Sequence, residues 1–343
     1  MKRVTQAQVA LHVGVTKATV SRVLAGAPCV LPETAARVNA AARQLGYHPD
    51  PMLTAVAASR WRGDGKRRGL TFGFISPFRH KRAGMDPENF AGAEARAVET
   101  GCCLDHFFLE DYRNSAAMQR TLLARGLRGL IVAPFFEAQP ALTLDWSRFC
   151  AVSIGITPYQ PPLHAVAQDS YDGTIMAWRK ALDYGYRRPG FAIMLHALPT
   201  HAEDDEARQS AALFLHQNDR APSERIPPFF HSIGDSFAAP ARDFIAWYRR
   251  WKPDAVIGFN RMEREFLLHA KVRVPDQVGF AALTTQSDLG IAGIVEAAVD
   301  VGAAAVDLLQ LALRTNQWGL PKKRIRHYLE AQWLDGPTLP RRR

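Results

Sequence analysis

Apolar residues in the first 24 positions recur at intervals of three and four, the spacing of one face of a short helix. Two such runs stand on either side of a glycine. They comprise Val9, Ala10 and Val13 before Gly14, and Val20, Val23 and Leu24 after it. The pattern predicts two short helices packed across a tight turn.

The second of these helices has a polar and basic face opposite its apolar one. That face consists of Lys17, Ala18, Ser21 and Arg22. A helix with a buried rear and a small, hydrogen-bonding front is typical of proteins that read the major groove of DNA. The alternative is a two-helix corner in a helical core that touches no DNA.

The run from Ala10 to Leu24, A-x-x-x-G-V-T-K-A-T-V-S-R-V-L, resembles the helix-turn-helix of the lactose-repressor (LacI/GalR) family of bacterial transcriptional regulators. The resemblance covers the turn, the caps and the recognition helix together. It implies sequence-specific binding to double-stranded DNA by a head whose contact residues are Thr5, Thr16, Lys17, Ala18, Ser21, Arg22 and Tyr47.

A third helix is predicted over 33–45, with Val38, Ala41, Ala42 and Leu45 inward and Gly46 past its end. Three helices then close a head over residues 1–49. Where the family usually has a Ser or Thr cap, this chain has Leu31 followed by Pro32, a residue that suits a first helical turn.

Residues 50–68 are expected to be a hinge helix and a linker. Asp50-Pro51 is a cap and first-turn signal for the segment MLTAVAAS, which is too short to be a stable helix in water. The resemblance implies that the segment folds on DNA beside its dimer mate, with an apolar wedge in the minor groove. The aligned wedge is Val56, with Leu53 and Met52 as rivals, and a merely apolar linker is the alternative.

From Leu70 onward, short apolar runs alternate with amphipathic stretches. Repeated β-α-β units of this length predict parallel sheets with helices on both faces, here two doubly wound units in succession. The predicted strands are 70–75, 102–109, 129–135, 150–155, 191–195, 227–230, 254–259 and 278–283, with a final strand pair over 325–334. The predicted helices are 88–100, 115–125, 173–184, 206–217, 239–251, 261–270 and 299–314.

The resemblance implies that this body, residues 69–340, has two lobes like those of periplasmic sugar-binding proteins. The expected first lobe is about 69–165 plus 285–315, and the expected second lobe is about 166–284 plus 316–340. The fold class is thus a three-helix helix-turn-helix head with a hinge helix, followed by a two-lobed α/β periplasmic-binding-protein-like body.

Charge is unevenly distributed along the 343 residues, whose formal net charge is +10. Residues 1–68 carry 11 Lys/Arg and 3 Asp/Glu, a balance of +8, whereas the remainder carries 32 and 30. Such a basic head suits a polyanion. No export signal and no apolar run of about 20 residues is apparent, so we expect a cytoplasmic protein with no membrane partner.

Motifs of catalysis and of cofactor binding are missing from the sequence, which contains no nucleophile elbow, phosphate loop, dinucleotide fingerprint or zinc-protease motif. The run from His201 to Glu206 is interpreted as a solvated first helical turn rather than a metal site. Cys102 and Cys103 are expected to face opposite ways on a strand, in packing rather than redox roles. We predict no enzyme activity, no metal and no cofactor.

Candidate effector residues stand where strand ends face the cleft between lobes. The resemblance assigns effector contacts to Arg208, Asn260, Asp172 and Phe90. An exposed helix arginine and helix packing are the alternatives for Arg208 and Phe90. Where the family has an acidic pair after V-G-F, this chain has Ala281-Ala282, so the effector is not expected to be held in the way that an ordinary hexose is, and its identity stays open.

The sequence therefore predicts a homodimeric transcriptional regulator, expected to be a repressor, that binds a palindromic operator. A small carbohydrate-like effector in the cleft would control its affinity for that operator. The alternative is a solute-binding protein, or an enzyme, on the same two-lobed scaffold.

Overall fold

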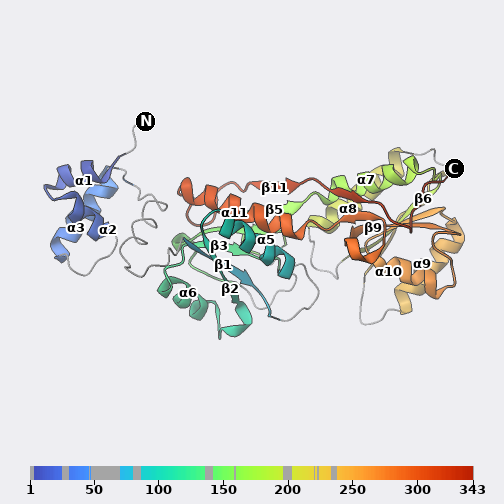
Figure 1. The fold of residues 1–343 in the computed structure, drawn as a ribbon, viewed down its shortest axis with the longest axis horizontal. Coiled ribbons are helices and arrows are strands. Elements are labelled where there is room, and N and C mark those ends of the chain that lie inside the picture. Colours follow the sequence, from blue (N-terminus) through green and yellow to red (C-terminus); the bar gives the residue numbers. More distant parts are fainter. Residues whose placement is uncertain are drawn as a thin grey trace.

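The computed structural model describes residues 4–24, 31–45, 47, 70–79, 86–135, 142–157, 160–195, 203–219, 221, 224–232 and 238–342. The predicted hinge helix and linker, including Leu53 and Val56, lie outside these residues. The described chain forms a helical head and a body with two sheets (Figure 1).

The head contains α1 (Gln6–Val13), α2 (Lys17–Leu24) and α3 (Pro32–Gln44), as predicted. Its core is built from the predicted inward residues, which are Val9, Ala10, Val13, Val20, Val23, Val38, Ala41 and Ala42. Gly14 ends α1 at a φ of 74°, a conformation that a residue without Cβ adopts at little cost. Leu31 precedes α3 and provides no side-chain cap, as its apolar side chain requires.

The first sheet of the body has six parallel strands in the order β11-β5-β4-β3-β1-β2. They are β1 (Thr71–Ser76), β2 (Cys103–Phe108), β3 (Gly129–Val132), β4 (Cys150–Ile154), β5 (His164–Gln168) and β11 (Arg326–Leu329). Helices α5 (Asp86–Glu99) and α11 (Ala298–Arg314) cover one face, and α6 (Ser115–Ala124) covers the other. Apolar side chains fill both interfaces, as the continuous apolar runs predicted.

The second sheet has the order β12-β10-β9-β8-β6-β7, with only the edge strand β12 antiparallel. Its strands are β6 (Pro189–Leu195), β7 (Phe229–Ser232), β8 (Ala255–Gly258), β9 (Gly279–Thr285), β10 (Gly293–Val295) and β12 (Gln332–Leu334). Helices α7 (Ser170–Asp183) and α8 (Glu203–Asn218) pack on one face, and α9 (Ala238–Trp251) and α10 (Arg261–His269) pack on the other.

The chain passes between the two sheets three times: after β5, between β10 and α11, and between β11 and β12. The side chain of Gln168 joins the first two crossings. Its Nε2 donates to the Val295 carbonyl at 2.8 Å, and its Oε1 accepts from the Ala297 amide at 3.2 Å. The two crossings are therefore held side by side.

Two sequence expectations need correction at these crossings. The strands predicted over 325–334 both form, but they do not pair with each other, because β11 joins β5 and β12 joins β10. The expected lobe limits also shift: residues up to 168 and the strand 326–329 belong to the first sheet, and residues 293–295 belong to the second. Strands β5 and β10 were missed, since runs of five and three residues carry little periodicity.

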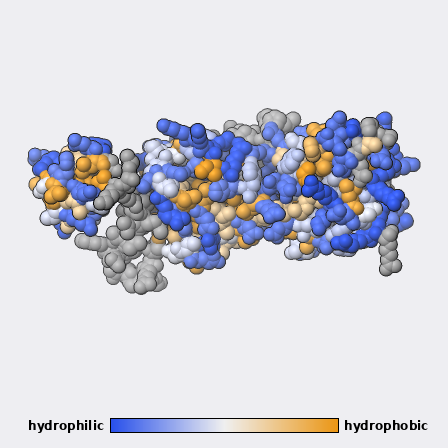
Figure 2. Space-filling model, turned by 90° about the horizontal axis from the view of Figure 1, so that it is seen from above, coloured by the Kyte–Doolittle hydropathy of each residue, from blue (hydrophilic) through white to orange (hydrophobic). Residues whose placement is uncertain are grey.

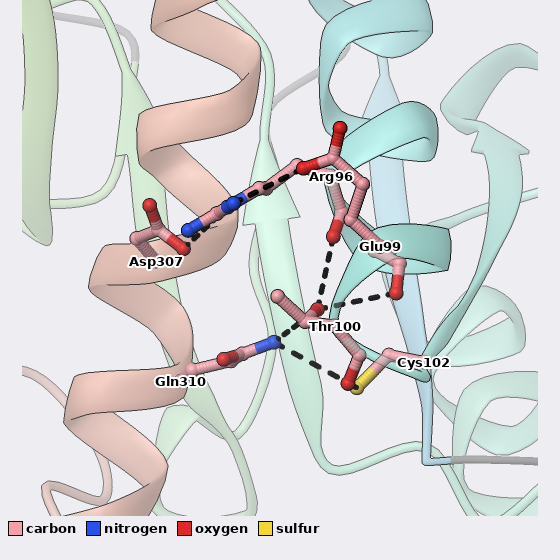
Figure 3. Close-up of polar contacts among 7 residues, drawn as sticks. Arg96, Glu99, Thr100, Cys102, Asp307 and Gln310 are labelled. Atoms are coloured by element: carbon pink, nitrogen blue, oxygen red, sulfur yellow. Dashed lines mark hydrogen bonds and ion pairs between the residues drawn. The ribbon is translucent and has the colours of Figure 1, made fainter.

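Helices α5 and α11 approach each other unusually closely. A Cβ on Gly92 would lie 1.9 Å from the Val299 carbonyl oxygen, and a Cβ on Gly302 would lie 2.0 Å from that of Asn89. Polar groups join the same helices farther along (Figure 3): Arg96 Nε donates to Asp307 at 2.9 Å, and Gln310 Nε2 donates to Thr100 Oγ1 at 2.6 Å. The crossing segment that leads into α11 is thereby fixed to the first lobe.

Cys102 is buried immediately before β2, and Cys103 is exposed at its first position, so the two face opposite ways as predicted. Burial raises the pKa of the Cys102 thiol. Burial also raises the pKa of Cys150 to about 12, which keeps that thiol protonated and inert.

Candidate nucleic-acid interface and interlobe site

The polar face predicted for α2 is exposed in the structure. Lys17, Ala18, Ser21 and Arg22 are all accessible to solvent, whereas Val20 and Val23 on the same helix are buried in the head core. The helix therefore presents one continuous front of small, hydrogen-bonding and basic side chains. Such a front can enter a major groove without disturbing the packing behind it.

Threonines cap the N-termini of both helices of this corner. Thr16 Oγ1 accepts from the Thr19 amide at 3.1 Å at the start of α2. Thr5 forms a capping box with Gln8, whose side-chain oxygen accepts from the Thr5 amide at 2.8 Å. Helix N-termini attract anions through their free amides and dipole, so both positions suit DNA phosphates.

Two further residues stabilise the corner. Arg37 on α3 donates from Nη2 to the Val13 carbonyl at the end of α1, at 2.8 Å. This contact has no local signal in the sequence, because the two residues are 24 positions apart. Tyr47 packs half-buried against the head core, and its amide donates to Ala42 at 2.8 Å. The predicted DNA contact of Tyr47 stays a prediction.

Arg208 lies on α8 and is mostly enclosed, with its side chain 12% exposed. Its guanidinium stands 5.0 Å from the ring centroid of Phe259, and Nη1 lies 3.6 Å from Oδ1 of the buried Asp205. The alternative interpretation, an exposed surface arginine, is wrong. Asp205 and Phe259 instead fix the guanidinium beside the end of β8.

Asn260 follows Phe259 directly and is the N-cap of α10. Its Oδ1 accepts from the Met262 amide at 2.8 Å, and its own amide donates to Glu263 Oε2 at 3.2 Å. Glu263 is fully buried, and its Oε1 lies 2.8 Å from His231 Nε2 on β7. This network holds Asn260 next to the Arg208 site. The N-x-x-E spacing could have indicated the capping box, whereas His231 has no sequence signal.

Glu296 lies on the crossing segment between Val295 and Ala297, the two residues held by Gln168. It accepts from Gln286 Nε2 at 3.2 Å. Burial raises its pKa, the negative charge of Glu88 on α5 raises it further, and Arg208 opposes the shift. Groups of both lobes therefore act on the Glu296 carboxyl beside Arg208. Glu296 was not among the effector residues predicted from the sequence.

Within the described residues, no hydrogen bond, ion pair or ring contact joins the other two predicted effector residues to this group. Asp172 is half-buried in the first turn of α7, where its amide donates to Asp169 Oδ1 at 2.9 Å. Phe90 stacks on His106 with ring centroids 4.2 Å apart and packs edge-on against Phe74. One face of its ring is thus occupied by packing, and its effector contact stays a prediction.

The interlobe site can offer a guanidinium, a primary amide and a carboxyl to a small polar ligand. Ala281 and Ala282, in place of the acidic pair, are fully buried in β9. Among the described residues no group of three or more His, Cys, Asp or Glu side chains could hold a metal ion. No helix in that part of the chain is both long and apolar enough to cross a membrane.

Comparison with protein families gives one match. Residues 5–50 match the family of bacterial regulatory proteins, lacI family. No match was found among curated proteins.

Solved structures share the fold, two of them over nearly the whole chain. A lac repressor dimer bound to operator and the anti-inducer ONPF is 20% identical, with a TM-score of 0.57 over 99% of this chain and 100% of that one. A complex of the transcriptional regulator CelR with cellobiose is 18% identical, with a TM-score of 0.58 over 98% and 100%. A LacI family transcriptional regulator from Enterococcus faecium with bound ribose is 14% identical, with a TM-score of 0.55 over 80% and 100%. At these identities the likeness establishes the head and the two-lobed fold.

Proposed function

We propose that this chain, whose residues 5–50 match the lacI family of bacterial regulatory proteins, is a sequence-specific DNA-binding transcriptional repressor. The observation that carries the proposal is the exposed front of α2, with Lys17, Ser21 and Arg22 outward over buried Val20 and Val23. Thr5, Thr16 and Tyr47 are assigned to DNA phosphates around this front, and Ala18 to a base contact.

Useful affinity requires two heads, because one helix-turn-helix reads only a few base pairs. A homodimer would place two copies of α2 on the two halves of a palindromic operator. Residues 50–58 would fold as hinge helices on that DNA, with Val56 or Leu53 as the minor-groove wedge. The cytoplasm is the compartment in which such a dimer meets its operator.

Operator affinity would be controlled by a small carbohydrate-like effector between the lobes. Arg208 and Asn260 are the proposed contacts on the second lobe, with Asp172 and Phe90 as further candidates. Because Gln168 joins two crossings beside Glu296, a ligand held there would bias the angle between the lobes and hence the separation of the hinge segments. The solved relatives bound to ONPF, cellobiose and ribose support this class of ligand.

In vitro selection tests the proposal. The full-length protein is used to select duplexes from a random-sequence pool, and the enriched sequences are tested by gel shift. We expect a recurrent palindrome that binds the protein as a dimer. If no sequence is enriched over the starting pool, the chain is a solute-binding protein or an enzyme on the same scaffold, and the head is an accessory.

A further inference from the structure

The second lobe has a strongly basic end. The segments that precede β6, β7, β8 and β9, together with the chain end, carry 12 Lys/Arg and 6 Asp/Glu; they are 183–188, 219–225, 249–254, 271–276 and 335–343. The rest of residues 69–343 carries 20 Lys/Arg and 24 Asp/Glu. Parallel strands start at one edge of a sheet, so the excess of positive charge gathers at the edge opposite the interlobe site.

Six exposed residues form the centre of this surface, which we call the basal patch. They are Arg187, Arg188, Arg250, Lys252, Arg341 and Arg342. Figure 1 shows this end of the second lobe, where the chain terminus lies beside β6, at the far end of the molecule from the head. Hydrophilic residues cover most of that end on the face drawn in Figure 2.

Asp254 is the organising residue of the basal patch. Its carboxylate accepts from the amides of Arg187 and Arg188 at 2.8 and 2.9 Å, and it lies 3.3 Å from Nη1 of Arg342. One half-buried carboxylate therefore holds three basic residues together and neutralises only one charge. The remaining positive charge faces solvent.

Aromatic rings and a carbonyl hold several of the guanidinium groups in place. Arg341 lies 4.4 Å from the ring centroid of Tyr184, and Arg342 lies 4.1 Å from that of Tyr186. Arg250 lies 5.4 Å from the centroid of Trp251, whose carbonyl accepts from Arg188 at 3.0 Å. Guanidinium planes ordered in this way lose less entropy when they bind a phosphate oxygen.

The surroundings of the basal patch favour a polyanion over other partners. None of the exposed large hydrophobic residues of the described chain belongs to it, so it offers nothing to an apolar protein surface or to the interior of a membrane. Several basic groups spread over one end of the lobe match the regular charges of a phosphate backbone.

We propose that the basal patch binds the sugar-phosphate backbone of a second DNA duplex, without sequence preference, while the heads hold the operator. The inference rests on the proposed function in one respect: a protein bound to its operator meets other segments of the same DNA at high local concentration. The protein would then bridge two DNA segments through opposite ends of its fold.

A bridging assay with the full-length protein tests the proposal. A duplex selected by the protein is fixed to beads and saturated with it, and a labelled duplex of mixed sequence is then added at about 50 mM salt. The patch variant carries R187Q, R250Q and K252N. None of these three side chains forms a hydrogen bond or an ion pair within the described residues, and Asn tolerates the φ of 47° at position 252.

The matched control carries R113Q, R120Q and R128N, three exposed residues of the first lobe, and has the same net charge as the patch variant. We expect wild type and control to capture the labelled duplex, and the patch variant to capture at least about tenfold less. All three should bind the selected duplex equally. Capture by the patch variant at the wild-type level, or no capture by wild type, overturns the proposal while leaving the repressor assignment intact.

Discussion

Replacing Arg22 by alanine separates the stability of the head from its ability to bind DNA. Arg22 is exposed in the last turn of α2, so its folded-state contribution is limited to its interaction with the helix C-terminus, about 0.3–1 kcal/mol. On DNA, an arginine on this front is worth about 1–3 kcal/mol. The dissociation constant for a selected duplex should therefore rise by about 5- to 150-fold.

Arg43 provides the control, because it is also exposed and also lies in the last turn of its helix, α3, away from the front of α2. Arg43→Ala should lose a similar amount of stability and little specific binding. Fluorescence anisotropy on selected and scrambled duplexes measures the binding, and thermal denaturation measures the stability. Wild-type affinity in Arg22→Ala, or an equal loss in Arg43→Ala, would refute the assignment of α2 as the recognition helix.

Three further predictions concern the cleft, the first lobe and the hinge. Arg208→Ala should keep operator affinity but lose the thermal shift given by sugars or glycosides that stabilise wild type. The exposed control Arg314→Ala should keep both the operator affinity and the shift. An unchanged shift in Arg208→Ala would move the effector site towards Asn260 and Asp172. Burial and the nearby Arg79 lower the pKa of His106 to about 4. The unfolded chain therefore takes up the proton first, and the free energy of unfolding should fall as pH decreases from about 6.5 towards about 4. His106→Phe should reduce this fall between about pH 7 and pH 5, and an equal fall in both proteins would contradict the prediction. The backbone amides of residues 50–58 should exchange freely in the unbound protein and become protected when the operator is bound, and protection before DNA is added would exclude folding on binding. Val56→Ala should weaken specific binding more than non-specific binding.

The sequence was sufficient to predict the head and most of the body, because each depends on local periodicity. Val20 and Val23 give the inward face of α2, and continuous apolar runs such as 255–259 give buried parallel strands. The sheet to which a strand belongs does not follow from local periodicity. The pattern over 325–334 predicts strands but contains no information about their partners, which lie in two different sheets.

The same distinction applies to the interlobe site. Motif resemblance pointed to Arg208 and Asn260, and the structure places both at the end of β8. His231 and Glu296 reach that region from distant parts of the chain, so no spacing in the sequence could indicate them. Contacts between residues far apart in sequence are visible only once the fold has brought them together.

The ratio of affinities for a selected palindromic duplex and for a scrambled duplex, measured with the full-length protein at one salt concentration, tests the central claim most directly. A sequence-specific repressor should bind the palindrome at least about 10³-fold more tightly, as a dimer. Equal affinity for the two duplexes would mean that the basic head binds DNA only through charge, and would contradict the proposed function.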